Sequence, residues 1–172
     1  MSTLTKLYEF IDAIGVAMMT TRRADGHLRS RPMATQKAAP GADLWFVARI
    51  GSGKLAELAH DPHVNLAYFK GGSSGWVSVS GEAVISQDRA TIRQLYSADW
   101  AIWFDKGDDP RHGTADDPRI VLVGVTVHGA EFLEVDAPGP VVLFEIAKGW
   151  LTGSEPELGE MHRLTDPHRP GA

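Results

Sequence analysis

The chain has 172 residues, a formal net charge of −5 and no cysteine, with 43% hydrophobic and 23% charged residues. These values predict one globular domain with its own core, and they exclude disulfides, thiolate metal sites and cysteine nucleophiles. The acidic charge argues against a nucleic-acid binder, which would show a basic face. The segment MSTLTKLYEF lacks the features of a signal peptide, and no apolar run approaches the ~20 residues that cross a bilayer, so we expect a cytoplasmic protein without membrane contact.

The first predicted element is an amphipathic helix. Ser2 or Thr3 can cap its start, and Gly15 stops it. Its apolar positions recur at helical spacing, which gives the helix one face to bury. These positions are Leu4, Leu7, Tyr8, Ile11 and Ile14.

Beyond this helix the pattern changes to short strands joined by hairpin-length turns. Val16–Thr21 and His27–Lys37 flank the turn at Ala24-Asp25-Gly26 and predict a hairpin. Pro32 interrupts the second strand and cannot donate to a ladder, so it implies an edge, a bulge or a gap in pairing. The other predicted strands are Leu44–Ala48, His63–Phe69, Trp76–Ile85, a hairpin of Arg119–Val127 with Ala130–Val135, and Val141–Ala147.

Two short helices interrupt these strands. One follows Gly51-Ser52-Gly53-Lys54, with Ser52 as its predicted N-cap, and the other spans Ala90–Tyr96 after a capping Asp88. Six or seven short strands with so little helix predict a mainly β protein, an antiparallel barrel, and not a doubly wound α/β fold. We assign residues 1–150 to one domain and expect the polar residues 151–172 to form a loosely ordered tail.

The glycine-bracketed loop Gly51-Ser52-Gly53-Lys54 is a candidate phosphate site. Unpaired backbone N–H groups at a helix start carry partial positive charge, and Ser52 and Lys54 add a hydroxyl and a full charge. The spacing is not that of a Walker A loop. A capped helix with a solvated lysine would give the same pattern.

Arg29-Ser30-Arg31-Pro32 is a second candidate element. Arginines at alternate strand positions project from the same face, and a guanidinium can fork onto phosphate oxygens. Pro32 would leave nearby backbone groups free to pair with a ligand ring. The alternative is an exposed basic edge that discourages edge-to-edge pairing.

Taken together, the motifs are more specific than any one of them. G-x-L-R-S-R-P-M, then G-S-G-K-x-x-x-L, D-P-x-V-N-L-A-Y-F, W-V-S-V-S-G-E-A and W-F-D-K-G-D-D-P follow one another between Leu4 and Glu134. In this order the chain resembles the pyridoxamine 5′-phosphate oxidase-like flavin-binding superfamily, and within it the general stress protein 26 branch. The resemblance implies a six-stranded antiparallel Greek-key split barrel of the FMN-binding type, and a homodimer with FMN at the interface.

The resemblance also implies roles for individual residues. The isoalloxazine ring and ribityl chain would lie along Arg31, Pro32, Met33 and Ala34, with Gln36 near the ring edge and Val47 and Ala48 beside the ribityl. Ser52 and Lys54, with Arg31, would hold the phosphate, and Trp76 would approach from the partner subunit. Gly53 stands where the oxidases carry an arginine, and their C-terminal Arg-x-His region has no match, so we do not expect a true pyridoxamine phosphate oxidase.

Other residue clusters receive plainer interpretations. Aromatic residues are more often core than cofactor contacts, with Trp100 and Trp103 the better candidates for a pocket wall. His60 and His63 lack a third ligand nearby, and the acidic loop of residues 105–119 fails the EF-hand pattern, so we predict no metal.

Three functions remain open from the sequence. The first is an FMN-dependent oxidoreductase, with NAD(P)H as a candidate reductant, because a flavin supplies the redox chemistry itself. The second is a non-catalytic FMN carrier or stress-response flavin sensor. The third is a haem or deazaflavin binder on the same barrel, since a fold does not determine its ligand.

Overall fold

A computed structural model describes residues 1–71, 75–104, 108–135, 139–152 and 159–172. Asp105 of the acidic loop, residues 72–74 before Trp76 and residues 153–158 of the predicted tail lie outside the described residues. The helices are α1 (Thr3–Ile14), α2 (Gly53–His60), α3 (Arg89–Leu95), the 3-10 helix η1 (Ala98–Trp103) and α4 (Gly139–Thr152). The strands are β1 (Val16–Arg22), β2 (Leu28–Ala34), β3 (Leu44–Arg49), β4 (His63–Phe69), β5 (Trp76–Ser86), β6 (Ile120–Glu134) and β7 (Glu160–Thr165).

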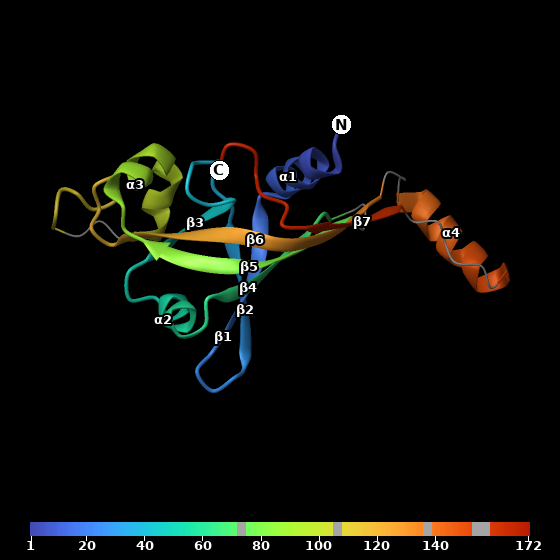
Figure 1. Cartoon of the computed structure of the whole chain (residues 1–172), viewed down its shortest axis with the longest axis horizontal. Helices are drawn as coiled ribbons and strands as arrows, with labels where there is room; N and C mark the ends of the chain where they lie inside the picture. The colour runs from blue at the N-terminus through green and yellow to red at the C-terminus, as the bar shows by residue number, and fades with distance from the viewer. Residues whose placement is uncertain (72–74, 105–107, 136–138, 153–158) are drawn as a thin grey trace.

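The strands form one antiparallel sheet in the order β2-β1-β4-β5-β6-β3, and β7 pairs with β6 beside this path (Figure 1). This confirms the mainly β fold with short helices. The hydrogen-bonded path is not closed, because β2 and β3 stand at its two ends and share no ladder among the described strands. Just beyond β2, the backbone N–H of Gln36 donates to the carbonyl oxygen of Trp45 at 2.8 Å, which brings these two ends together.

Local sequence explains the first elements. The hydroxyl of Ser2 accepts a hydrogen bond from the Thr5 backbone N–H at 3.1 Å, and Gly15 ends α1 with a φ of 73°. Pro32 lies in β2 at the end of the strand order, as expected for a residue that cannot donate to a second ladder.

The main core fills the space between α1 and the sheet, and its largest side chains include Leu7, Ile11, Met19, Phe46, Tyr68 and Phe132.

The predicted hairpin at residues 119–135 is wrong, because β6 is one continuous strand of 15 residues. Its pairing with β5 shifts register between Ser80 and Gly81, which face Gly129 and Val127. His128 is therefore the extra residue of a bulge, not part of a turn. A Cβ on Gly81 would lie 2.3 Å from the carbonyl oxygen of Thr126, so the close approach of the two backbones requires glycine there.

The C-terminal third departs from the sequence prediction in two further ways. Residues 141–147 belong to helix α4 and not to a strand, since a short apolar run fits either element and Pro140 suits a first helical turn. The described part of the tail is not loose, because β7 pairs along β6 from Thr165 opposite Gly129 to Glu160 opposite Glu134.

Asp43 connects the end of the chain to the sheet. Its carboxylate is 3% exposed and accepts hydrogen bonds from the backbone N–H groups of Val127 at 2.8 Å and Arg169 at 2.6 Å. The imidazole of His168 lies 3.1 Å from the same carboxylate, which raises the pKa of His168. The Tyr8 hydroxyl donates to the Pro167 carbonyl, and the Arg169 guanidinium pairs with Asp12. The last residues are thus held against α1 and β6.

In the part of the chain that the structure describes, none of the helices combines the length and the apolar character needed to span a membrane.

Removing the Asp43 carboxylate should destabilise the fold. Asp43→Ala leaves the buried Val127 N–H without its acceptor and releases the C-terminal residues. We expect it to lower the free energy of unfolding by about 2–4 kcal/mol. Glu131→Ala, which breaks an exposed pair with Arg163, should cost at most about 1 kcal/mol. Urea unfolding measures both, and equal losses would contradict the role of Asp43.

Candidate functional site

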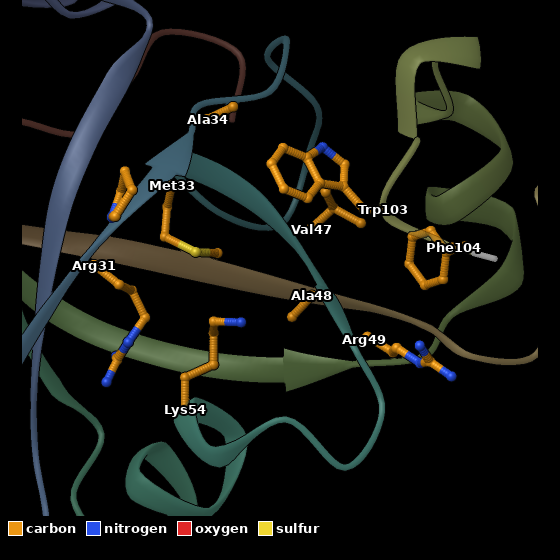
Figure 2. A pocket seen from close by; sticks show the side chains of 10 residues that line it. Arg31, Met33, Ala34, Val47, Ala48, Arg49, Lys54, Trp103 and Phe104 are labelled. Carbon is orange, nitrogen blue, oxygen red and sulfur yellow. The ribbon is translucent and has the colours of Figure 1, made fainter. Parts of the chain in front are cut away.

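A pocket of about 330 Å³ lies where β2 and β3 fail to pair (Figure 2). β2 contributes one wall, β3 the other, and the first turn of α2 and the end of η1 close the sides. The gap in the hydrogen-bonded path therefore contains a cavity between the two strands. The lining residues are Arg31, Pro32, Met33, Ala34, Val47, Ala48, Arg49, Lys54, Trp103 and Phe104.

The two strand walls are mostly apolar. Met33 is buried, and Figure 2 shows its side chain in the middle of the pocket, opposite Val47 and Ala48 of β3. β3 pairs with β6 along one edge, with Val47 opposite Leu122, so its other edge faces the pocket. The structure brings together seven of the residues carried over from the resemblance: Arg31, Pro32, Met33, Ala34, Val47, Ala48 and Lys54.

Lys54 is the cation at one end of the pocket. It lies in the first turn of α2, and Figure 2 shows its amine directed toward Ala48. Burial, and then the nearby charge of Arg31, lower the pKa of Lys54. Lys54 makes no hydrogen bond or salt bridge with the described residues, so the charge needs an anion from elsewhere to offset its loss of hydration.

Ser52 precedes Lys54 at the N-cap of α2 but does not cap the helix. Its backbone is extended, with φ −68° and ψ 141°, and its hydroxyl makes no capping hydrogen bond. Its Oγ atom is buried and has no hydrogen-bond partner among the described residues. The predicted N-cap position is therefore confirmed, but the hydroxyl does not form the capping bond and is left as a buried polar group.

The Arg31 guanidinium already forms hydrogen bonds within the protein. Its guanidinium donates to the Thr21 hydroxyl at 2.7 Å and to the Glu57 carboxylate at 2.6 Å. The predicted common direction of Arg29 and Arg31 is confirmed, since Arg29 lies 3.2 Å from the second oxygen of Glu57. Burial acts to raise the pKa of Glu57, but the hydrogen bonds from Thr21 and Arg31 bring it below its ordinary value.

Three residues of the site were not among the predicted ones. Glu57 and Thr21 accept hydrogen bonds from the Arg31 guanidinium, and Arg49 lines the pocket. A signal for Glu57 existed, because it follows Lys54 by three residues on an eight-residue helix whose buried residues include it. A buried glutamate is rare without a cationic partner.

Of the two tryptophans predicted as a pocket wall, one is in place. Trp103 lines the pocket and is 72% exposed. Trp100 is not a wall residue, because it is 1% exposed and packs in a second core cluster under α3. Its indole N–H donates to the Gln36 side-chain oxygen at 2.8 Å, and Gln36 is not among the lining residues. Phe104 is the second aromatic lining residue.

Trp76 lies elsewhere in the chain. It opens β5, opposite Phe69 of β4 and Leu133 of β6, and it does not line the pocket of its own subunit. Its contact with a cofactor across a subunit interface stays a prediction.

The sequence matches the family model described as pyridoxamine 5′-phosphate oxidase like over residues 2–157. The chain belongs to the pyridoxamine 5′-phosphate oxidase-like family. It is 30% identical to Protein bli-3 of Neurospora crassa over 166 residues, which are 95% of this chain and 79% of that protein.

Solved structures of this family share the fold. A structure assigned to general stress protein 26 of Jannaschia sp. CCS1 is 26% identical, with a TM-score of 0.70 over 96% of this chain and 99% of that one. The general stress FMN/FAD binding protein of Xanthomonas citri is 23% identical, with a TM-score of 0.60 over 74% of this chain and 84% of that one. The Jannaschia structure supports the general stress protein 26 branch, and the Xanthomonas citri structure shows the shared fold.

In this member of the family, the pocket combines a cationic end with an apolar slot. Among its described lining residues, the ionisable groups are Arg31, Arg49 and Lys54, with no carboxylate or imidazole. No group of three or more His, Asp or Glu within the described ranges is arranged to hold a metal ion, and His63 is instead hydrogen-bonded to Asp61 at 2.7 Å. The arrangement suits a flat, apolar group that ends in an anion.

The two tryptophans should respond differently to truncation. Trp100→Ala empties a core position, so we expect it to lower the free energy of unfolding by about 3–5 kcal/mol. Trp103→Ala removes a mostly exposed side chain and should change it by less than about 0.5 kcal/mol. Chemical denaturation of both variants measures this, and a large loss for Trp103→Ala would show that this residue is also core.

Proposed function

We propose that this protein binds FMN in the pocket between β2 and β3, and that it acts as an FMN-dependent oxidoreductase. The observation that carries the proposal is Lys54, a half-buried cation that makes no hydrogen bond or salt bridge with the described residues. It lies at one end of a pocket whose strand walls are mostly apolar. A phosphate would supply the missing anion, and the slot would receive the ring.

The polar end fits a phosphate monoester in three respects. The Ser52 hydroxyl is buried without a hydrogen bond, and Lys54 lies two residues after it. α2 begins between them, so its first backbone N–H groups carry partial positive charge toward an anion. Arg31 uses two of its five N–H groups on Thr21 and Glu57, which leaves others for phosphate oxygens.

The apolar end fits an isoalloxazine ring. Met33 and Ala34 from β2 face Val47 from β3, and Trp103 can cover the ring from outside. β2 pairs with β1 alone among the described strands, so its outer backbone groups are available to the polar atoms of a flavin. The Xanthomonas citri relative, which is described as binding FMN or FAD, supports the choice of a flavin.

When bound, the flavin supplies the redox chemistry, including acceptance of hydride from a donor such as NAD(P)H. The lining residues of this chain then bind the phosphate, orient the ring and exclude water, and none of the described ones needs to move a proton. FMN-dependent consumption of NAD(P)H in steady state would support the enzyme. Tight FMN binding without turnover on a broad acceptor panel would favour a carrier or sensor instead.

We also propose that the pocket is completed by a second copy of the chain. Trp103, which lines the pocket, is 72% exposed, and Ile102 before it in the chain is 77% exposed; such an apolar surface marks a contact site. In a dimer, Trp76 of the partner would reach the cofactor. Sedimentation of the FMN-bound protein should give the mass of two chains, and an FMN-bound monomer would contradict this.

The Lys54 ammonium should account for part of the FMN affinity. Lys54→Ala removes a charge-assisted contact, so we expect FMN binding to weaken by about 1–3 kcal/mol, while riboflavin, which lacks the phosphate, binds as before. Flavin fluorescence titration measures both ligands. Lys37→Ala, an exposed lysine away from the pocket, is the control. Wild-type protein that binds riboflavin as tightly as FMN would overturn the phosphate assignment.

A further inference from the structure

Glu57 is a buried carboxylate with more partners than a helix surface position would provide. It is 8% exposed, and one of its oxygens accepts hydrogen bonds from the Thr21 hydroxyl and from the Arg31 guanidinium, both at 2.6 Å. Its other oxygen lies 3.2 Å from Arg29. These contacts tie α2 to both strands of the β1–β2 hairpin.

Glu57 reaches Arg31 from behind the pocket. It does not line the pocket, and it lies instead at a separate hollow together with Arg23, Ala24, Asp25, Gly53 and Ala56. A carboxylate in that place keeps its negative charge away from a bound anion and still holds the guanidinium. Since Arg31 also donates to Thr21 at 2.7 Å, its guanidinium is held at two points by residues that do not line the pocket.

The choice of salt-bridge partners by Glu57 also determines which cation remains available to an anion in the pocket. Lys54 precedes Glu57 by three residues on α2, a spacing that favours a salt bridge. Among the described residues, Glu57 forms its salt bridges with Arg29 and Arg31 instead, and its charge acts on Lys54 only through space. The lysine therefore remains directed into the pocket, while the arginines neutralise the carboxylate.

We infer that Glu57 is a positioning residue, which orients Arg31 toward the phosphate of the flavin. The inference rests on the proposed function and adds a residue that contacts no ligand. Held side chains lose less freedom on binding, so a preorganised guanidinium binds phosphate more tightly than a mobile one. Loss of the Glu57 carboxylate should therefore weaken binding of the phosphate group and leave binding of the isoalloxazine ring unchanged.

The test compares FMN with riboflavin on the wild type and on Glu57→Gln. We expect the ratio of the FMN to the riboflavin affinity to fall about tenfold in the variant, with riboflavin binding within about twofold of wild type. Glu131→Gln, which neutralises an exposed glutamate paired with Arg163, should leave the ratio unchanged. Tyr8→Phe, which loses a hydrogen bond far from the pocket, controls for a general loss of stability.

A second pair of variants separates positioning from a merely structural role. In an Arg31→Ala background, Glu57→Gln should change the ratio by less than about twofold, because the residue acts through Arg31. If Glu57→Gln does not fold, Thr21→Val removes the other anchor of Arg31 and should lower the ratio about threefold.

The outcomes distinguish the inference from the proposed function. A wild type that binds FMN no more tightly than riboflavin would refute the phosphate site itself. A wild type that prefers FMN, with an unchanged or increased ratio in Glu57→Gln, would refute only the role of Glu57. An increase would mean that the carboxylate acts by repelling the phosphate.

Discussion

The break in hydrogen bonding between β2 and β3 is the constraint on which the rest of the structure depends. A sheet that closed fully would fill this space with a ladder and leave side chains alone in its interior. Here β6 pairs with β5 and with β3, so β3 is held in place on one edge only, while β2 pairs with β1. Pro32 fits this arrangement because it has no N–H to donate toward the missing neighbour. The pocket follows from unpaired backbone, and its walls come from residues far apart in the chain.

Charge then distinguishes the two ends of that pocket. Lys54, Arg31 and Arg29 gather beside the first turn of α2, and a single buried carboxylate, Glu57, holds the two arginines. A buried carboxylate stays ionised only where hydrogen bonds and cations offset its dehydration. The network thus ties the hairpin to the helix and holds the two arginines beside Lys54, while Met33, Ala34 and Val47 make the strand walls of the pocket apolar.

The chain termini reinforce the same sheet from its other face. α1 packs its buried face on the core, and the C-terminal residues run past it, held by Asp43 and by the Tyr8 hydroxyl. β7 extends the sheet along the second half of β6. A segment whose composition is polar can therefore still be ordered, because strand pairing uses backbone groups that composition does not report. For the same reason His128-Gly129 suggests a turn in the sequence and forms a bulge in the fold, where partner strands decide whether an extra residue is tolerated.

The sequence by itself determined the local features: the capped first helix, the hairpin with Pro32 at an edge, the helix start at Ser52, and the order of motifs that points to the family. These depend on neighbours along the chain, whose preferences are written in residue type and spacing. Only the tertiary structure decided that Trp100 is core while Trp103 lines the pocket, that Ser52 does not cap its helix, and that residues 141–147 are helical. It also paired Glu57 of α2 with two arginines of β2 and left Lys54 without a hydrogen bond or salt bridge to the described residues. Such choices depend on which segments meet in space, and burial and pairing energies set them only after the sheet has formed.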